Sequence, residues 1–504
     1  MKISYVRRAE MKTAKKVSKT MLNRITPVNQ KAILDTERRK DTASKAQERC
    51  NEKVTIESPV PILTLLDMEI VHSLNAHGRL HIKAVIEHEQ QPKCFSSFYQ
   101  NEQIQVFDAT SESPVLIFCG KIQATAYEMQ GQLLIASIQA VSYSVDLEGV
   151  VRNRSFQNPS LTFESIVAQV MEGIGGRFLW HAPAQQRIGT PFIQYEETDW
   201  DFLKRLISHL NQPLHVSVTT DRPDVYIGIN RGRQRDLSEA TILKRGRSNR
   251  YYTGGGFREG HSRLQYRYLR VRHDCSSWQM GDFVRFENGR FTIFERTICF
   301  EKGELFYLDT MGEAGFLYQA TMGNEAFRGL QLSGSITRVE RESVYIQFDF
   351  DQERRADYAW PWVPEVGNLC YIMPEVGSKV LLSFASDQEQ DGAATHLLRT
   401  SGVPMQASHK EFATVHNKQL GLYPEGMVLK GQGRAATLSM MDESGIELDT
   451  DRAISLQARD RIVIRAGRRL TIRAPKQVLM QTNQANVELN QDFNLFAPSG
   501  VRTR

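Results

Sequence analysis

An eight-residue pattern of apolar and polar positions repeats from Leu438 to Ala485. Each block reads apolar, polar, apolar, polar and small, and a mostly polar triplet follows. Alternation places every second side chain of an extended strand on one face, so each block predicts a short strand followed by a turn. The apolar first and third positions are Leu438, Met440, Ile446, Leu448, Ile454, Leu456, Ile462, Ile464, Leu470, Ile472, Val478 and Met480.

These short strands cannot bury their apolar face within one block, so they must stack on further strands. A β-helix made by a single chain and an ordinary meander are two possible arrangements. A third is an intertwined homotrimer, in which the repeated apolar residues fill a common axis and most strand edges are paired between chains. We predict this third arrangement, a trimeric, triple-stranded β-helical spike over residues 438–504. Its six blocks would form a rod of roughly 30 Å.

Alternating patterns also predict strands upstream of the repeat. Residues 62–71 and 79–87 read as a hairpin around a turn at Asn75–Gly78. Further strands are expected at 103–109, 115–129 and 133–147, and a second β-rich stretch runs from 251 to 318. These two stretches suit a barrel or a sandwich.

Two amphipathic helices are expected between the β-rich stretches. Residues 161–174 place apolar side chains at helical spacing, with Gly175 and Gly176 after them. In the second helix, Thr198 is a candidate N-cap and Pro213 ends the segment. Acidic residues at its start could be read as catalytic carboxylates, but the helix dipole favours them there in any case. They are Glu196, Glu197, Asp199 and Asp201.

Residues 331–401 predict a small five-stranded barrel of OB type. Its aromatic residues could stack on sugars or bases, although we expect them to serve the core and interfaces. They are Phe350, Trp360, Trp362 and Tyr371. We interpret residues 402–437 as a linker to the spike.

Composition adds few constraints. The chain has 504 residues and a net charge of only +5, which gives no general reason to expect nucleic-acid binding. Residues 1–53 form a basic extension, which could bind nucleic acid or an anionic surface but suits a solvated, partly helical tail or one docked on another subunit. The spacing of His273, Cys275 and Cys299 fits no common zinc pattern. We therefore expect no metal, no cofactor and no catalytic residues.

The segment QYEETDWDFLKRLISHL, residues 194–210, resembles the hub domain of VgrG proteins and contractile phage tails. A second resemblance lies in the barrel, where the family's spike base has a Pro-x-Val-Gly-x-x-Val string. Its matching positions are Pro374, Val376, Gly377, Val380, Phe384 and Asp387. The resemblance implies a mainly β chain with a two-barrel hub at 54–330, a helical insert at about 159–212 and an OB-type barrel at 331–401. Valine-glycine octads are absent, however, and arginine dominates the turns of this short rod.

What the resemblance implies about function is mechanical. It predicts the trimeric hub and spike of a contractile injection system, which caps the inner tube and punctures the target envelope. The implied partners are an inner-tube, Hcp-like hexameric ring, baseplate proteins, and a PAAR-like tip protein or effector. No signal peptide is recognised, so we expect assembly in the cytoplasm into a phage tail, a tailocin, an extracellular particle or a type VI secretion system.

Two other classes of function remain open. One is a surface adhesin or tailspike that binds glycan through the OB-type barrel. The other is a cell-wall hydrolase or polysaccharide lyase, for which no triad or carboxylate pair stands at a suitable spacing.

Overall fold

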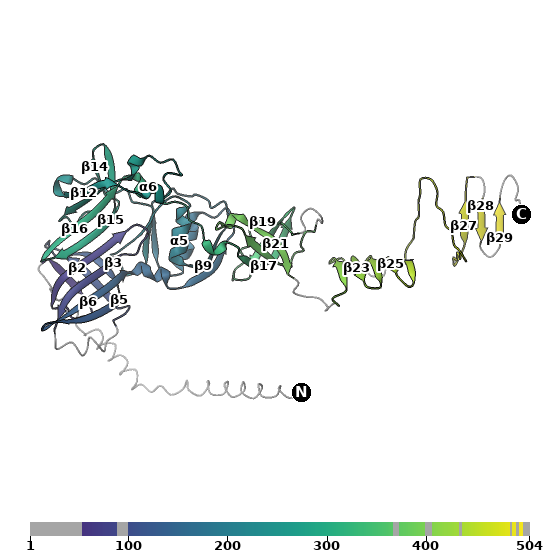
Figure 1. Cartoon of the computed structure of the whole chain (residues 1–504), viewed down its shortest axis with the longest axis horizontal. Helices are drawn as coiled ribbons and strands as arrows, with labels where there is room; N and C mark the ends of the chain where they lie inside the picture. The colour runs from purple at the N-terminus through teal and green to yellow at the C-terminus, as the bar shows by residue number, and fades with distance from the viewer. Residues whose placement is uncertain are drawn as a thin grey trace, which may run out of the picture. The chain divides into compact units, whose positions relative to one another are not determined.

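The computed structural model describes residues 53–87, 99–365, 372–398, 406–432, 436–483, 486–489 and 493–496. The chain divides into two compact units, with the boundary between residues 400 and 401 (Figure 1). Antiparallel sheets dominate both units, which confirms the mainly β fold that the alternating patterns predict. No helix among the described residues is long and apolar enough to cross a membrane.

An eleven-stranded sheet forms the largest part of the first unit, in the order β1-β4-β5-β6-β3-β2-β15-β16-β13-β12, with β14 paired to β15. The strands before the insert are β1 (Val54–Glu57), β2 (Thr64–Ser73), β3 (Arg79–Ile86), β4 (Gln103–Asp108), β5 (Val115–Gln130) and β6 (Leu133–Ser142). Those after it are β12 (Thr241–Arg247), β13 (Arg267–His273), β14 (Phe283–Phe286), β15 (Gly289–Glu301) and β16 (Glu304–Gly312).

The two β-rich halves share this one sheet. Strand β2 pairs antiparallel with β15 and places Ile70 opposite Ile298. Alternation within each strand predicts the strands themselves but not this long-range pairing between them. The expected strand at 133–147 is also shorter than predicted, because Tyr143–Glu148 forms a 3-10 helix, η2.

The insert contains both predicted helices. They are α4 (Phe163–Glu172) and α5 (Asp199–Ser208), and each begins at a threonine that accepts a backbone hydrogen bond, Thr162 or Thr198. Their apolar faces pack into one core with the surrounding strands. These strands are β7 (Val151–Phe156), β8 (Arg177–Trp180), β9 (Phe192–Thr198), β10 (Leu214–Val216) and β11 (Asp224–Ile227).

Five strands of the first unit form a separate small barrel, in the order β19-β18-β17-β20-β21. A parallel bridge between Trp362 and Ala394 joins the two ends of this sheet. Trp360 lies in its core with Phe348 and Phe384. The strands are β17 (Gln331–Glu340), β18 (Ser343–Phe348), β19 (Ala359–Pro361), β20 (Lys379–Phe384) and β21 (Gly392–Leu398).

The second unit begins with a five-stranded meander and ends with a three-stranded one. The first comprises β22 (Lys410–Ala413), β23 (Gln419–Tyr423), β24 (Gly426–Lys430), β25 (Thr437–Met441) and β26 (Gly445–Asp449), and the second β27 (Val478–Gln481), β28 (Asn486–Leu489) and β29 (Phe493–Phe496). The segment 402–437, interpreted above as a linker, thus contains three strands. Of the octads, three form paired strands, whereas residues 450–477 have no strand pairing within this described part of the chain.

Candidate functional site

One face of the five-stranded meander in the second unit is apolar except for Lys410 of β22, which lies opposite Leu422. Directly opposed residues form one row across all five strands, Phe412, Leu420, Leu429, Leu438 and Leu448. A parallel row two residues away contains Leu422, Met427, Met440 and Ile446. Because strand side chains alternate between faces, both rows lie on the same side of the sheet. The apolar pattern therefore begins upstream of Leu438, at Phe412.

This face is uncovered in the single chain. Ile446 is 76% exposed and Leu448 50%. The same holds for the apolar positions of the octads that lack strand pairing, namely Ile454, Leu456, Ile462, Ile464, Leu470 and Ile472. Leu438, Met440 and Val478 are half-buried, and Met480 is exposed. Full burial of one such side chain contributes about 1.5–3 kcal/mol, so a run of this length favours association with another apolar surface.

Of the acidic residues at the start of α5, Asp199 is buried in a polar network, whereas Glu196 and Asp201 are exposed. Asp199 accepts from Arg154 Nη2 at 2.5 Å and from Arg152 Nε at 3.1 Å. Gln194 donates to the same carboxylate at 3.1 Å. Asp201 instead caps the helix together with Thr198. The residues of the QYEETDWDFLKRLISHL segment thus hold the helix in place, which gives them a structural role.

Arg205 extends this network into the small barrel. It pairs bidentately with Glu197, at 2.7 and 2.8 Å, and donates to Glu389 Oε1 at 2.6 Å. Burial alone would lower the pKa of Arg205, but Glu389 and Glu197 raise it above its ordinary value. Burial raises the pKa of Glu197, and Arg205 opposes that shift. Trp360 of the barrel adds a second link, since its Nε1 donates to Gln157 at 3.0 Å.

A second buried network lies near the β2–β15 pairing. Asp309 accepts two hydrogen bonds from Arg296 and one from His273, each at 2.9 Å. Burial would raise the pKa of Asp309, but Arg296 and His273 hold it below its ordinary value. Tyr307 donates to Asp108 at 2.5 Å and so links β16 to β4.

Two buried histidines, His72 and His215, line a cavity of about 330 Å³ beside this network. Burial, helped by Arg296, lowers the pKa of His72 to about 4. Burial, helped by His72, lowers the pKa of His215 to about 3. The His215 ring stacks on Tyr226 with 4.5 Å between centroids. Both imidazoles are therefore neutral at pH 7.

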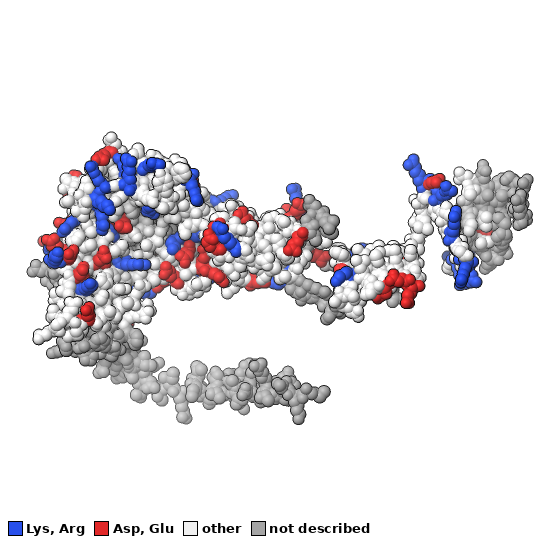
Figure 2. Space-filling model, in the orientation of Figure 1, with Lys and Arg blue, Asp and Glu red and all other residues white. Residues whose placement is uncertain are grey.

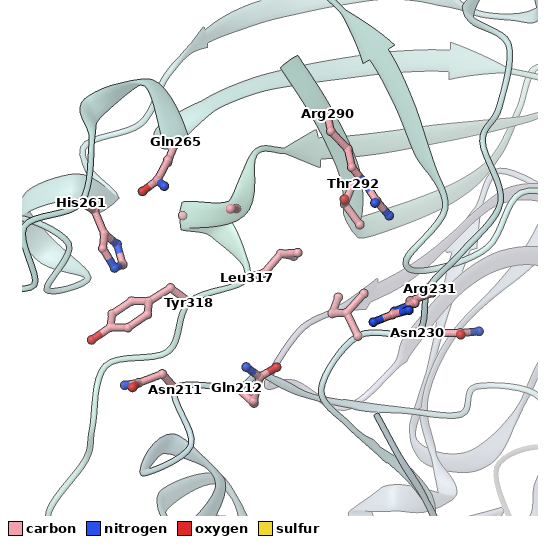
Figure 3. A pocket seen from close by; sticks show the side chains of 13 residues that line it. Asn211, Gln212, Asn230, Arg231, His261, Gln265, Arg290, Thr292, Leu317 and Tyr318 are labelled. Atoms are coloured by element: carbon pink, nitrogen blue, oxygen red, sulfur yellow. The ribbon is translucent and has the colours of Figure 1, made fainter. Parts of the chain in front are cut away.

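A larger cavity, of about 600 Å³, lies where the insert meets the second half of the large sheet (Figure 3). Arg231 follows β11, Arg290 begins β15, and Asn211 and Gln212 follow α5. His261 and Tyr318 close the other side, with 4.5 Å between their ring centroids. This lining combines two arginines and several carboxamides with an apolar part that includes Ile229 and Leu317.

The aromatic residues of the barrel that could stack on sugars or bases are mostly packed within the protein. Trp360 is 0% exposed and Phe350 stacks on Phe348, while Trp362 is half-buried. Tyr371 lies outside the described residues. Among the described residues, no group of three His, Cys, Asp or Glu side chains is arranged to hold a metal ion. The buried Trp360 cannot serve as a stacking platform for glycan.

Two features of these sites are not predicted by the sequence patterns described above. The partnership of Arg205 with Glu389 joins residues 184 positions apart, and no local pattern signals it. The upstream apolar rows carried only a partial signal, since Gly421 separates Leu420 from Leu422 but the apolar Val428 separates Met427 from Leu429. Their spacing departs from eight residues, so a search for strict octads passes over them.

No protein-family model and no curated protein sequence matches the chain. Among solved structures, a chain of the half-lidded Francisella PdpA-VgrG complex aligns with a TM-score of 0.50 and 10% identity, over 87% of this chain and 97% of that one. A second structure is that of the E. coli c3393 protein, described as a type VI secretion component similar to the T4 phage tail proteins gp27 and gp5. It aligns with a TM-score of 0.47 and 15% identity, over 68% of this chain and 99% of that one. A 43 kDa tail protein of prophage MuSo2 from Shewanella oneidensis aligns with a TM-score of 0.42 and 12% identity. The alignment covers 54% of this chain and 100% of that one.

At these identities the likeness concerns the fold. The class that the fold defines is a mainly β chain with a helical insert, a small barrel and a terminal repeat with an open apolar face. Within this class the fold is VgrG-like, which confirms the resemblance that residues 194–210 indicate.

Proposed function

We propose that this protein is the trimeric hub and spike of a contractile injection system, which caps the inner tube and punctures the target envelope. The observation that carries the proposal is the exposed apolar face of the five-stranded meander, together with the exposed apolar residues of the octads that follow it. Two further copies of the chain would cover this face most simply, because each copy has the same unsatisfied surface. The VgrG-like fold supports the same conclusion.

The proposed role is mechanical and involves no catalytic step. A spike must transmit axial load from the hub, so its base must be firmly attached. The ion pair of Arg205 with Glu389 and the hydrogen bond of Trp360 to Gln157 supply such an attachment between the insert and the barrel. We infer that this barrel is of OB type, because its five strands close through a parallel bridge between Trp362, directly after β19, and Ala394 of β21.

The partners follow from the role. We propose that the hub contacts an Hcp-like ring of the inner tube and baseplate proteins, and that the spike carries a PAAR-like tip protein or an effector. Assembly would occur in the cytoplasm, before the particle acts on the envelope of a target cell. A glycan-binding adhesin is the weaker candidate, since the barrel's most prominent aromatic residue, Trp360, lies in the core.

The oligomeric state tests the proposal. Light scattering coupled to size-exclusion chromatography of the purified full chain should give the mass of three chains, each 57.5 kDa. A monodisperse monomer at micromolar concentration would contradict the spike, because the apolar face of the second unit would then be stable in water.

A further inference from the structure

The cavity between the insert and the second half of the sheet is distinguished by its charge. Its thirteen lining residues include Arg231 and Arg290 but no Asp or Glu. The surrounding segment 231–290 contains fourteen Lys and Arg against six Asp and Glu, although the whole chain carries only +5. Figure 2 shows Lys and Arg side chains gathered over the region of β12, β14 and α6 (Arg250–Thr253).

Both lining arginines lack a carboxylate partner within the described part of the chain. The nearby carboxylates are already engaged: Glu313 pairs with Arg267 at 2.6 Å, and Glu287 pairs with Arg245 at 3.0 Å. An arginine pair facing a concave surface without counter-charge attracts an anionic group, and guanidinium recognises carboxylate by paired hydrogen bonds.

The backbone holds Arg290 in place. Glu287 and Asn288, with φ of 44° and 61°, form the two-residue loop between β14 and β15, as a type I′ hairpin requires. The Arg290 guanidinium carbon lies 3.8 Å from the centroid of the Phe283 ring, so cation–π contact restricts its side chain.

Arg231 is held by its loop. Gly232 donates its backbone N–H to Asn230 at 2.9 Å, and Arg233 donates its own to Asp282 Oδ1 at 2.7 Å. A Cβ at Gly232 would stand 2.4 Å from the carbonyl oxygen of Gly281, so only glycine permits this approach. Two arginines on rigid segments lose little conformational freedom when they bind a ligand.

The rest of the lining indicates what carries the anionic group. Four carboxamides, Asn211, Gln212, Asn230 and Gln265, offer both donors and acceptors, as peptide groups require. Ile229, Leu317 and Tyr318 add an apolar wall (Figure 3). A volume of about 600 Å³ is in the range that takes a drug-sized ligand or a short peptide.

We propose that this cavity binds an acidic peptide segment of a partner protein, with one carboxylate between Arg231 and Arg290 and an adjacent apolar side chain against Leu317 and Tyr318. A nucleic acid fits less well, because its regularly spaced phosphates require a basic track rather than a cavity with an apolar wall. The proposal does not rest on the spike function, since the cavity lies entirely in the first unit.

The test uses the full chain and three fluorescein-labelled probes in an anisotropy titration. The probes are Gly-Leu-Glu-Leu-amide, Gly-Leu-Gln-Leu-amide, and Gly-Leu-Gln-Leu with a free carboxyl terminus. The Glu peptide should bind at least ten-fold more tightly than its Gln amide counterpart. The free-acid probe distinguishes a chain terminus from a side chain as the source of the carboxylate. Whichever of the free-acid probe and the Glu peptide binds more tightly identifies that source.

Variants locate the binding. Arg231→Gln and Arg290→Gln should each weaken binding of the Glu peptide about ten-fold. Arg285→Gln is the matched control, because Arg285 lies opposite Arg290 in the same hairpin but does not line the cavity. The affinity of this variant for the Glu peptide should stay at the wild-type value. Unchanged melting temperature would show that each variant is folded.

Three results would overturn the proposal. The Glu and Gln amide peptides could bind equally, which would remove the role of the carboxylate. Arg285→Gln could lose as much affinity as Arg290→Gln, which would indicate general electrostatic attraction. Inorganic phosphate could displace the Glu peptide at an equal or lower concentration than acetylated Leu-Glu-Leu-amide, which would make the cavity a site for phosphate.

Discussion

Arg205 of helix α5 and Glu389 of the small barrel form an ion pair with 2.6 Å between Nη1 and Oε1, and both side chains are buried. Glu389 also accepts from the backbone N–H of Ile193 at 3.1 Å. The pair therefore fastens the barrel both to the helix and to strand β9 of the insert. In the proposed spike, this pair is one of the contacts, with the Trp360–Gln157 hydrogen bond, through which force would pass from the insert to the barrel.

Removing the arginine should be strongly destabilising. In Arg205→Met, Glu197 and Glu389 lose their buried cation, and an uncompensated buried charge costs about 3–5 kcal/mol. The midpoint of urea unfolding, followed by circular dichroism, measures this loss. Arg328→Met is the control, because the Arg328 side chain is 58% exposed and solvent screens its pairs with Glu325 and Asp387, so the unfolding midpoint of this variant should barely move. Equal midpoints for the two variants would mean that the buried pair contributes nothing specific.

Adjacent residues of β25 lie on opposite faces of the meander, so substitutions at the two positions can be compared directly. Leu438 lies in the apolar row opposite Leu429 and Leu448, whereas Ser439 points to the other face. In the proposed trimer, Leu438→Asp should lower the mass measured by light scattering, because a buried charge without a partner is costly. Ser439→Asp should remain trimeric. Loss of the trimer in both variants would indicate that the apolar face is not the interface.

The octads without intrachain pairing give a separate test of the rod. Ile462 and Ile464 are both more than half exposed in the single chain. If they face the axis of a trimer, Ile462→Asp combined with Ile464→Asp should lower the melting temperature of the trimer and favour its dissociation. The paired control is Arg461→Asp with Arg465→Asp, at positions outside the apolar pattern. Trimers of equal stability in both double variants would place residues 454–474 outside the core.

Local patterns predicted most strands and both helices, because hydrophobic periodicity depends only on the residues within each segment. The capping residues Thr162 and Thr198 are examples, since the cap and its helix are adjacent in sequence. The joining of the two halves through Ile70 and Ile298 was not predictable in this way, because either strand could equally have been an edge. For the same reason, the octads predicted an apolar face but could not by themselves specify what covers it.

The buried histidines predict a dependence of stability on pH. The pKa is lowered to about 4 for His72 and to about 3 for His215, below the ordinary value of 6.5. The unfolded chain therefore binds more protons between pH 6.5 and pH 4, so stability falls as the pH falls through this window.

His215→Phe keeps an aromatic ring beside Tyr226 but removes one titrating group. Between pH 7.5 and pH 5.0, wild type should lose more unfolding free energy than the variant, by up to about 1.4 kcal/mol for each pH unit below 6.5. Urea unfolding at several pH values measures the difference. From pH 7.5 to 9 the two curves should run parallel, because the imidazole is neutral in both states there. Parallel curves below pH 6.5 as well would show that His215 is protonated as readily in the folded chain as in the unfolded one.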